Sequence, residues 1–302
     1  MEKSSELCGL VIVNKEEGIT SQGVVNRVKR IFGVSKAGHT GTLDPMATGV
    51  LPVLIGRGVK ASEFMLTGDK HYGATLLLGV TTDTEDVTGT VLTENEVELS
   101  EEEVLGAIKK FVGKIMQTPP MYSALKVGGK KLCDLARQGQ SVEREPREIT
   151  VHSIKAERIN DREYYLDVTC SKGTYIRTLC ADIGASLGVG GVMKTLKRLT
   201  ASGYSIDEAR TLSEYENMTD EERCAAVYPI ERIFAKYETV TLSDFFARLA
   251  HSGQEIYLNK IKKSFKVGDV VNIADSEGFF AVGEVREFDS GLAIKPIRQF
   301  RQ

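Results

Sequence analysis

One acidic residue near the start of the sequence stands in a run of small residues. Asp44 lies within GHTGTLDPMATG, residues 38–49, between a glycine-rich turn and an apolar stretch. Glycine lets a backbone bend sharply and approach a ligand closely, and the proline that follows restricts the conformation of the acid itself. A carboxylate aimed from such a loop into a cleft can act as a nucleophile or as a general base. The alternative is an Asx-type turn that leads into the next strand, and the loop alone leaves both open.

Two further stretches carry aromatic and basic residues of a kind that binds anions or bases. In SKGTYIRTL, residues 171–179, Arg177 falls in the first turn of an expected helix, where packed neighbours can hold its guanidinium for a carboxylate or a phosphate. Tyr175 adds a flat ring at the same junction. In KHYGATLLLG, Tyr72 stands at the mouth of an apolar strand, where its ring can stack on a base. Each also has a simpler explanation, a surface arginine or a core tyrosine.

Apolar patterns around these stretches predict the elements that hold them. Continuous apolar runs and strict alternation indicate strands, whereas apolar residues three and four positions apart indicate helices. Strands are expected at residues 9–14, 50–56, 71–79 and 164–170. Helices are expected after Thr20 or Ser21, after a capping box of Ser100 and Glu103, and from residues 173–174. We therefore expect an α+β fold, a mixed and mostly antiparallel sheet flanked by helices, with the cleft across its middle.

Two regions differ in character from this core. Residues 117–147 contain a double proline, a double glycine and little apolar content, so we expect a projecting excursion with one short helix near residues 131–137. Basic residues interleaved with Tyr122 are typical of a segment that lies against RNA, although a single lysine is usually a solvated charge. After a boundary near residues 229–238, short strands separated by glycine turns predict a small β-barrel-like domain.

The composition is that of an ordinary globular protein. Of 302 residues, 41% are hydrophobic and 27% are charged, and the net charge of -3 argues against a simple basic binder. The five cysteines and four histidines show neither zinc-binding nor disulfide spacing, so no metal is expected. No apolar run is long enough for a membrane span, and the apolar patch near the N-terminus is too short for a signal peptide. We expect a cytoplasmic protein, with a monomer as the default state.

Taken together and in this order, the motifs resemble those of the TruB family of tRNA pseudouridine synthases. The string GHTGTLDPMATGVL, from Gly38 to Leu51, matches the family's signature loop intact. Four other blocks also match: VNKEEGITS, KHYGATLLLG, QTPPMYSALKVGGKKL and CSKGTYIRTL. The resemblance covers essentially the whole chain. It implies a catalytic domain over residues 1–237, a thumb-like RNA-binding insertion over residues 117–147, and a PUA-like RNA-binding domain over residues 238–302.

The resemblance implies an enzyme that isomerises uridine to pseudouridine at position 55, in the T loop of tRNA, without a cofactor. Asp44 matches the catalytic aspartate, and Arg177 matches its basic partner, whose charge is expected to keep Asp44 ionised. The target base is expected to leave its stack and to rest against Tyr72. The other positions expected to contact the substrate or support its pocket are His39, Tyr175, Leu196 and Lys15, the last with a structural role.

The parts of the tRNA that the protein contacts, and the alternatives to this function, are also expectations at this point. The thumb-like insertion is expected to close on the T stem-loop and the PUA-like domain to touch the acceptor end, with no obligatory protein partner. Whether Asp44 attacks C6 of the uracil or acts at the ribose stays open. One alternative is a non-catalytic tRNA-binding or folding protein, and another is a glycosidase, which would need a second carboxylate about 5–5.5 Å from Asp44. A third is a subunit of an RNA-guided particle, whose relatives carry lysine-rich tails beyond the point where this sequence ends.

Overall fold

The chain folds around one large sheet of nine strands, seven of which run in the order β1-β3-β12-β4-β11-β10-β7. A computed structural model describes residues 7–66 and 68–301, so the first six residues of the N-terminal stretch interpreted above lie outside the described residues. The strands are β1 (Gly9–Lys15), β2 (Ala37–His39), β3 (Thr48–Ile55), β4 (Lys70–Leu78), β7 (Gly113–Gln117), β10 (Arg147–Arg158), β11 (Glu163–Cys170), β12 (Gly191–Ala201) and β13 (Tyr204–Ser205). Only β12 and β3 pair in parallel within this sheet as described. The expected α+β class with a mostly antiparallel sheet is confirmed.

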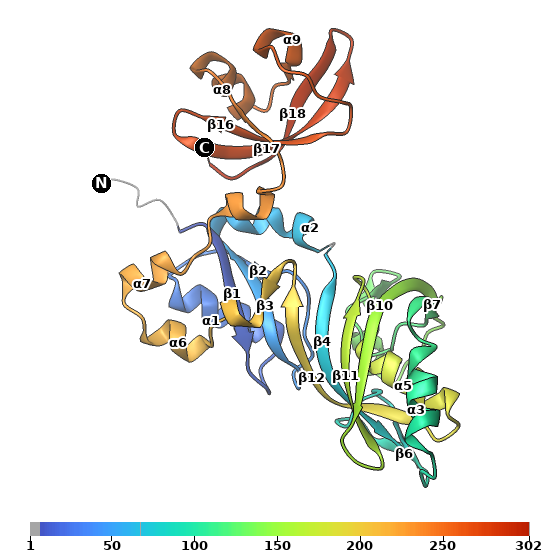
Figure 1. Ribbon diagram of the computed structural model, residues 1–302. Helices are drawn as coiled ribbons and strands as arrows, with labels where there is room; N and C mark the ends of the chain where they lie inside the picture. Colours follow the sequence, from blue (N-terminus) through green and yellow to red (C-terminus); the bar gives the residue numbers. More distant parts are fainter. Residues whose placement is uncertain (1–6, 67, 302) are drawn as a thin grey trace.

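Helices cover the sheet at its two ends (Figure 1). Beside β1 and β3 lie α1 (Ser21–Ile31), α6 (Leu212–Asn217) and α7 (Asp220–Ala225), and beside β4, β10 and β12 lie α3 (Glu101–Lys109) and α5 (Ile176–Ser186). The Thr20 hydroxyl caps α1 by accepting from the amide of Gly23, and Ser100 and Glu103 form the expected capping box before α3. A cap of this kind contributes about 1 kcal/mol to stability.

Alternation along the strands buries the faces that the sequence predicts. In β11, Tyr164, Leu166, Val168 and Cys170 are all fully buried on one side of the strand. They form a single apolar core with Leu179 and other residues of α5. This core holds the start of α5 rigidly against β4, which matters for the cavity described below.

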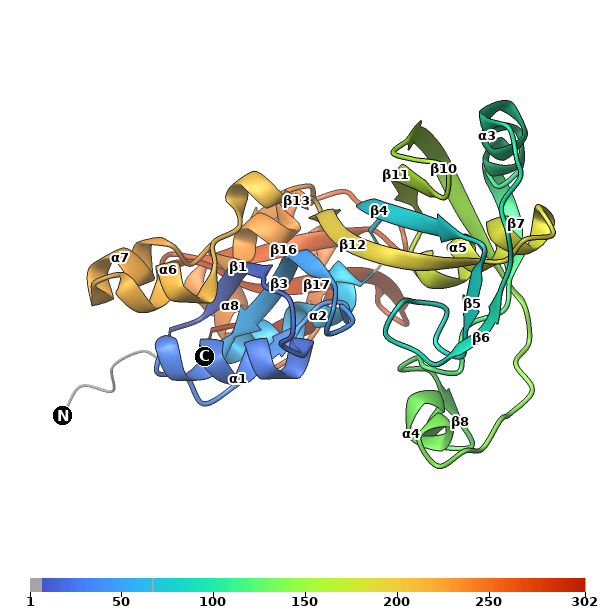
Figure 2. The ribbon, with the colours of Figure 1, turned by 90° about the horizontal axis from the view of Figure 1, so that it is seen from below.

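The segment between β7 and β10 leaves the sheet, as expected for residues 117–147 (Figure 2). It carries a two-stranded hairpin, β8 (Lys126–Val127) with β9 (Lys130–Lys131), followed by the short helix α4 (Leu132–Ala136). A smaller hairpin, β5 (Val80–Thr82) with β6 (Val91–Glu94), follows β4. We call residues 117–147 the thumb segment.

The C-terminal part is a second, curled sheet of five strands that fits the expected PUA-like domain. Its order is β14-β16-β17-β18-β15. The elements are β14 (Thr239–Thr241), α8 (Asp244–His251), β15 (Ile256–Tyr257), α9 (Leu258–Ile261), β16 (Val270–Asp275), β17 (Gly278–Phe288) and β18 (Gly291–Gln299). The two helices were not expected from the sequence. In the described part of the chain, no helix is both long and apolar enough to cross a membrane.

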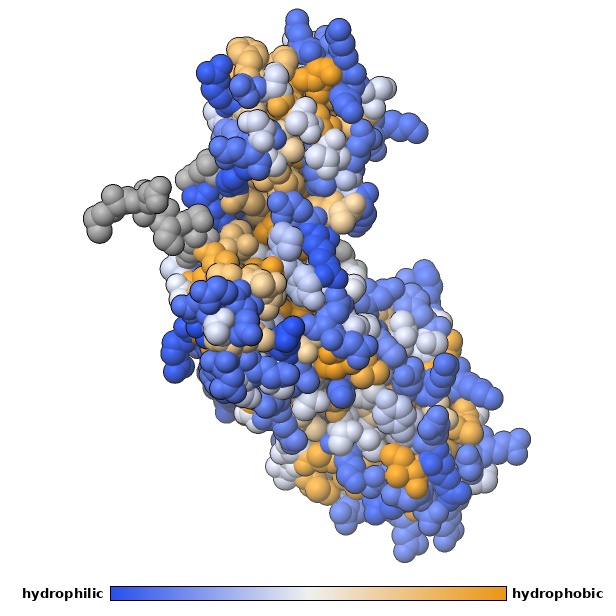
Figure 3. Space-filling view, turned by 60° about the vertical axis from the view of Figure 1, so that its left-hand side comes forward, coloured by the Kyte–Doolittle hydropathy of each residue, from blue (hydrophilic) through white to orange (hydrophobic). Residues whose placement is uncertain are grey.

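The two sheets meet through aromatic side chains, and the molecule narrows there (Figure 3). Phe234, in the turn of helix η3 (Ile230–Phe234), lies 5.1 Å from the Phe64 ring of α2 (Ser62–Met65). It also lies 5.9 Å from Phe279 and 5.4 Å from Phe300 of the second domain, all measured between ring centroids. The two sheets therefore share one apolar cluster, and the boundary at residues 237 and 238 stays a prediction.

Candidate active site

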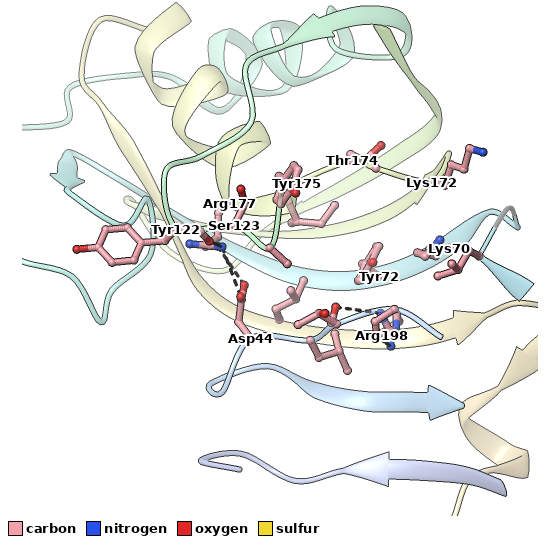
Figure 4. A pocket seen from close by; sticks show the side chains of 18 residues that line it. Asp44, Lys70, Tyr72, Tyr122, Ser123, Lys172, Thr174, Tyr175, Arg177 and Arg198 are labelled. Atoms are coloured by element: carbon pink, nitrogen blue, oxygen red, sulfur yellow. Dashed lines mark hydrogen bonds and ion pairs between the residues drawn. The ribbon is translucent and has the colours of Figure 1, made fainter. Parts of the chain in front are cut away.

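One cavity brings together five of the seven residues that the sequence marks as catalytic or substrate-binding. It has a volume of about 290 Å³. The five residues are Asp44, Tyr72, Tyr175, Arg177 and Leu196, contributed by the loop before β3, by β4, by the start of α5 and by β12 (Figure 4). Residues 122–124 at the base of the thumb segment close one side. Elements that are far apart in the sequence thus meet at the middle of the large sheet.

The loop that carries the carboxylate is clamped by two polar side chains. The ammonium of Lys15, at the end of β1, donates to the carbonyl oxygens of Pro45 at 2.9 Å and Ala47 at 2.5 Å. The hydroxyl of Ser21, at the start of α1, accepts from the amide of Leu43 at 2.8 Å and donates to its carbonyl at 2.9 Å. Since these contacts fix the backbone before and after the acid, its side chain is directed into the cavity.

Arg198 on β12 fastens the same loop from the opposite side. Its side chain is fully buried, and its guanidinium donates to the carbonyl oxygens of Val50 at 2.7 Å and Gly41 at 3.1 Å. Gly49 lets the backbones of β3 and β12 lie this close together. It has a φ of 100°, and a Cβ placed on it would lie 2.2 Å from the backbone carbonyl oxygen of Arg198. Any larger residue at Gly49 would force β3 and β12 apart.

Arg177 is the centre of the polar network in the cavity. Its Nε lies 3.0 Å from Oδ2 of Asp44, and its other nitrogens donate to the carbonyl oxygens of Thr84 at 3.0 Å and Tyr122 at 2.7 Å. A second carboxylate, that of Asp86, lies 3.8 Å from Nη1. The guanidinium therefore ties the Asp44 loop, the turn after β5 and the base of the thumb segment to the first turn of α5.

The charge of Asp44 is set by two opposing effects. Burial raises the pKa of Asp44 above its ordinary value, while the guanidinium of Arg177 lowers it and the nearby carboxylate of Asp86 raises it further. Arg177 is expected to keep Asp44 ionised, and its charge does lower the pKa of Asp44. Burial raises that pKa by more, so the net shift of the pKa is upward. The side chain of Asp44 is one third exposed on the side that faces the cavity, so a substrate can reach the carboxylate.

The aromatic side chains give the cavity its flat walls. Tyr72 is buried on β4, and burial raises the pKa of its phenol, so the ring is uncharged at neutral pH. Tyr175 precedes α5 and is held through its backbone by the side-chain amide of Gln117, which accepts from the Tyr175 amide at 2.8 Å and donates to its carbonyl at 3.1 Å. Burial raises the pKa of Tyr175 as well. Leu196 adds an apolar surface from β12.

The other two predicted positions do not line this cavity. Lys15 lies behind the Asp44 loop, where burial lowers its pKa to about 8, and its contacts fit the structural role expected for it. His39, at the end of β2, lines a separate hollow of about 440 Å³ together with Lys36 and Ser62. Among the described residues, the buried Nδ1 of His39 has no hydrogen-bond partner. A contact between His39 and a substrate stays a prediction.

Sequence reasoning missed Arg198 and Asp86. Arg198 shares its face of β12 with Leu196, two residues earlier, so strand periodicity was a signal that could have found it. Asp86 lies in a polar turn that is typical of a surface. It is buried because its carboxylate accepts from the hydroxyl of Thr84 at 2.9 Å and from the amide and hydroxyl of Thr88 at 2.9 and 2.6 Å.

Comparison with known families matches most of this chain to one of them. The N-terminal domain of the TruB family pseudouridylate synthases matches residues 29–176, and the C-terminal domain of tRNA pseudouridylate synthase B matches residues 177–235. The first match contains the Asp44 loop and Tyr72, and the second begins at Arg177. Residues 236–302, which hold the second sheet, lie beyond both.

Individual proteins show the same likeness over nearly the full length. The tRNA pseudouridine synthase B of Clostridium tetani is 40% identical over 277 residues, which cover 91% of this chain and 95% of that protein. The protein of the same name from Saccharophagus degradans is 42% identical over 291 residues, 93% of each chain. A chain in the crystal structure of a Cbf5-Nop10-Gar1 complex aligns with a TM-score of 0.72 at 26% identity, covering 98% of this chain and 85% of that one. The chain belongs to the TruB family of pseudouridylate synthases.

Proposed function

We propose that this pseudouridine synthase converts the uridine at position 55, in the T loop of tRNA, and that Asp44 is its catalytic residue. The observation that carries the proposal is the pairing of Asp44 with Arg177 at 3.0 Å inside a cavity walled by Tyr72. The names of the relatives, tRNA pseudouridine synthase B, support tRNA as the substrate.

The reaction is an isomerisation that uses the substrate's own atoms. The bond between N1 of uracil and C1′ of ribose breaks, the ring turns, and a new bond forms between C5 and C1′. The proton on C5 is then lost and N1 takes up a proton, so that no electrons enter or leave. Acid, base and nucleophilic groups are sufficient for these steps.

The cavity suits a single nucleotide drawn out of its helix or loop. At about 290 Å³ it lies at the lower end of the range for small-molecule sites. Unstacking a base costs a few kcal/mol, and stacking on an aromatic ring returns about 1–3 kcal/mol. Tyr72 offers that ring, and its hydroxyl is also a candidate to assist the removal of the C5 proton.

The carboxylate of Asp44 is the nucleophile or base of the proposal. Attack on C6 of the ring, attack on C1′ and removal of a C2′ proton all stay open, because each needs only a carboxylate directed at the nucleotide. In every case Arg177 orients Asp44 and balances its charge at 3.0 Å, while Tyr175 and Leu196 shape the wall that holds the turning ring.

The rest of the molecule is proposed to bind the remaining parts of the tRNA. The thumb segment borders the cavity through Tyr122, so closing it on the T stem-loop would cover the target nucleotide. The PUA-like domain, residues 238–302, is proposed to contact the acceptor end. We propose that a monomer acts without a protein partner in the cytoplasm, in contrast to the chain in the Cbf5-Nop10-Gar1 complex.

Mapping of pseudouridine tests this proposal. Unmodified tRNA is incubated with the pure protein and no additives, in parallel with tRNA that carries cytidine at position 55. We expect one new pseudouridine, at position 55, and none in the cytidine-55 tRNA. Modification elsewhere would refute the assignment to the T loop. Retained tRNA binding without any modification would favour the non-catalytic binding protein instead.

A further inference from the structure

The two ends of the cavity differ in charge. Asp44 and Arg177 lie at one end, and Lys70, Lys172 and Arg198 lie at the other (Figure 4). Tyr72 lies between Arg177 and Lys70 in the same view. The proposed chemistry takes place at the first end and gives no role to the two lysines at the other.

The three cations come from different elements, and two of them, Arg198 and Lys70, meet at one glycine of the Asp44 loop. A Cβ placed on Gly41 would lie 3.6 Å from Nη1 of Arg198 and 4.0 Å from Cε of Lys70. The ammonium of Lys70, the first residue of β4, donates to the carbonyl of Gly68 at 2.9 Å and has two further donors. Lys172 approaches from the turn before α5 and is exposed. A concave wall of positive charge results.

No carboxylate of the described residues forms an ion pair with any of these three cations, whereas Arg177 at the opposite end faces two. The neighbouring Asp69 lies 3.2 Å from His152 instead. Burial lowers the pKa of Lys70, and the charges of Arg198 and Lys172 lower it further. Like charges gathered in a partly buried site are costly unless an anion joins them.

We propose that Lys70, Lys172 and Arg198 form a phosphodiester-binding subsite, which holds a phosphate next to the target nucleotide. The inference rests on the proposed function, since an RNA substrate supplies the anion. Arg198 contributes its positive charge from a fixed position, because its guanidinium already donates to the carbonyl oxygens of Val50, Thr42 and Gly41. The two lysines offer adjustable point charges. With the phosphate anchored there and the base against Tyr72, the ribose is placed between the anchor and Asp44.

Binding measurements on a protein that does not turn over isolate this subsite. The background is Asp44→Asn, and the variants are Lys70→Met and Lys172→Met. Lys110→Met is the matched control, because Lys110 is an exposed residue at the end of α3, outside the cavity. Arg198 is left intact because it also fastens the Asp44 loop.

The RNA ligands are T stem-loops with one neutral methylphosphonate linkage, placed on the 5′ or the 3′ side of the target nucleotide. Each carries 2′-deoxyribose on the 5′ side of that linkage, which keeps the linkage intact. A stem-loop with the same deoxyribose and an ordinary phosphate is the control for each. Dissociation constants are measured across a series of salt concentrations.

We expect Lys70→Met to weaken binding about tenfold, as for the loss of one hydrogen bond to a charged group. The slope of log affinity against log salt should fall by about 0.7, the value for one phosphate contact on a single strand. One of the two methylphosphonates should weaken binding to the parent protein similarly and should have no further effect on Lys70→Met. Lys172→Met should show the same coupling, and Lys110→Met none.

The subsite would be refuted if Lys70→Met weakened binding to each methylphosphonate stem-loop as much as to its phosphate control. An unchanged salt slope for Lys70→Met would refute it as well. The proposed function is tested separately by turnover of unmodified tRNA by the protein without substitutions. Normal turnover without coupling between the lysine substitutions and the methylphosphonates would therefore refute the subsite and leave the proposed function in place. Coupling without turnover would remove the catalytic proposal and keep the subsite.

Discussion

Replacing Arg177 with methionine tests the polar network of the cavity most severely. The side chain is only 6% exposed and serves two carboxylates and two backbone carbonyls. Breaking a buried ion pair costs about 3–5 kcal/mol, and a buried carbonyl left without a donor costs about 1–3 kcal/mol. The carboxylate of Asp44 is one third exposed, so water screens part of this loss. We expect a net loss of about 4 kcal/mol in the free energy of unfolding.

The loss should appear as a fall of about 10 °C in the melting temperature. Arg27→Met is the matched control, because Arg27 pairs with Glu216 at 2.6 Å on the surface, where both side chains are more than one third exposed. Such a pair contributes about 0–1 kcal/mol. A scanning calorimeter compares the two variants with the parent protein under the same conditions.

The same variant makes a prediction about pH. Because Arg177 lowers the pKa of Asp44 against the effect of burial, its removal should raise that pKa. The acidic limb of kcat/KM against pH should then move to higher pH in Arg177→Met, measured with tritium release from C5-labelled uridine in tRNA. The reasoning fails if Arg177→Met melts within the range of Arg27→Met, or if the acidic limb stays in place.

Three other predictions follow from the same geometry. Because burial raises the pKa of Asp44 in the folded protein, protonation of Asp44 stabilises the native state below that pKa. The melting temperature of the parent minus that of Asp44→Asn should therefore fall as the pH rises through the pKa of Asp44, and a constant difference would contradict this. Gly49→Ala should lower the free energy of unfolding by more than about 3 kcal/mol, because the new Cβ clashes with Arg198. Gly139 also has a positive φ but lies in open space, so Gly139→Ala should lower it by about 1–2 kcal/mol, both measured by chemical denaturation. The thumb segment should be cleaved by protease in the free protein and protected by tRNA, and equal cleavage rates would contradict its closing on RNA.

The three catalytic candidates that the sequence indicates each belong to a motif with its own backbone geometry. The glycine-rich loop before β3 indicates Asp44, the mouth of an apolar strand indicates Tyr72, and the strand-to-helix turn indicates Arg177. The structure brings these three to one cavity. Their distances and the balance of charge at Asp44 depend on tertiary burial, which no local pattern reports.

Arg198 shows why other residues of the site could not be recognised in the sequence. It stands in MKTLKRLT among Lys194 and Lys197, which are exposed, so the stretch reads as a basic surface. The strand alternates between Leu196 and Arg198, but register shifts in β12, between Met193 and Thr195 and again after Arg198, leave this alternating run short. Burial of a charged residue is decided here by the carbonyl oxygens of other elements, which are distant in the sequence.

The joint between the two domains could not be predicted for a similar reason. The sequence marks a boundary by a change in strand spacing, but Phe234 packs against Phe64 on one side and Phe279 and Phe300 on the other. Cutting the chain at residue 237 would expose this cluster. The proposed contact of the PUA-like domain with tRNA is therefore better tested by charge substitutions among Lys260, Lys262 and Lys266 than by truncation.

Single-turnover tritium release at saturating tRNA tests the central claim most directly. The parent protein should release tritium from C5 of one uridine per tRNA. Asp44→Asn should bind the same tRNA with similar affinity and release tritium at least about a thousandfold more slowly, as for loss of a catalytic group. A rate for Asp44→Asn near that of the parent would show that the carboxylate paired with Arg177 does not perform the chemistry.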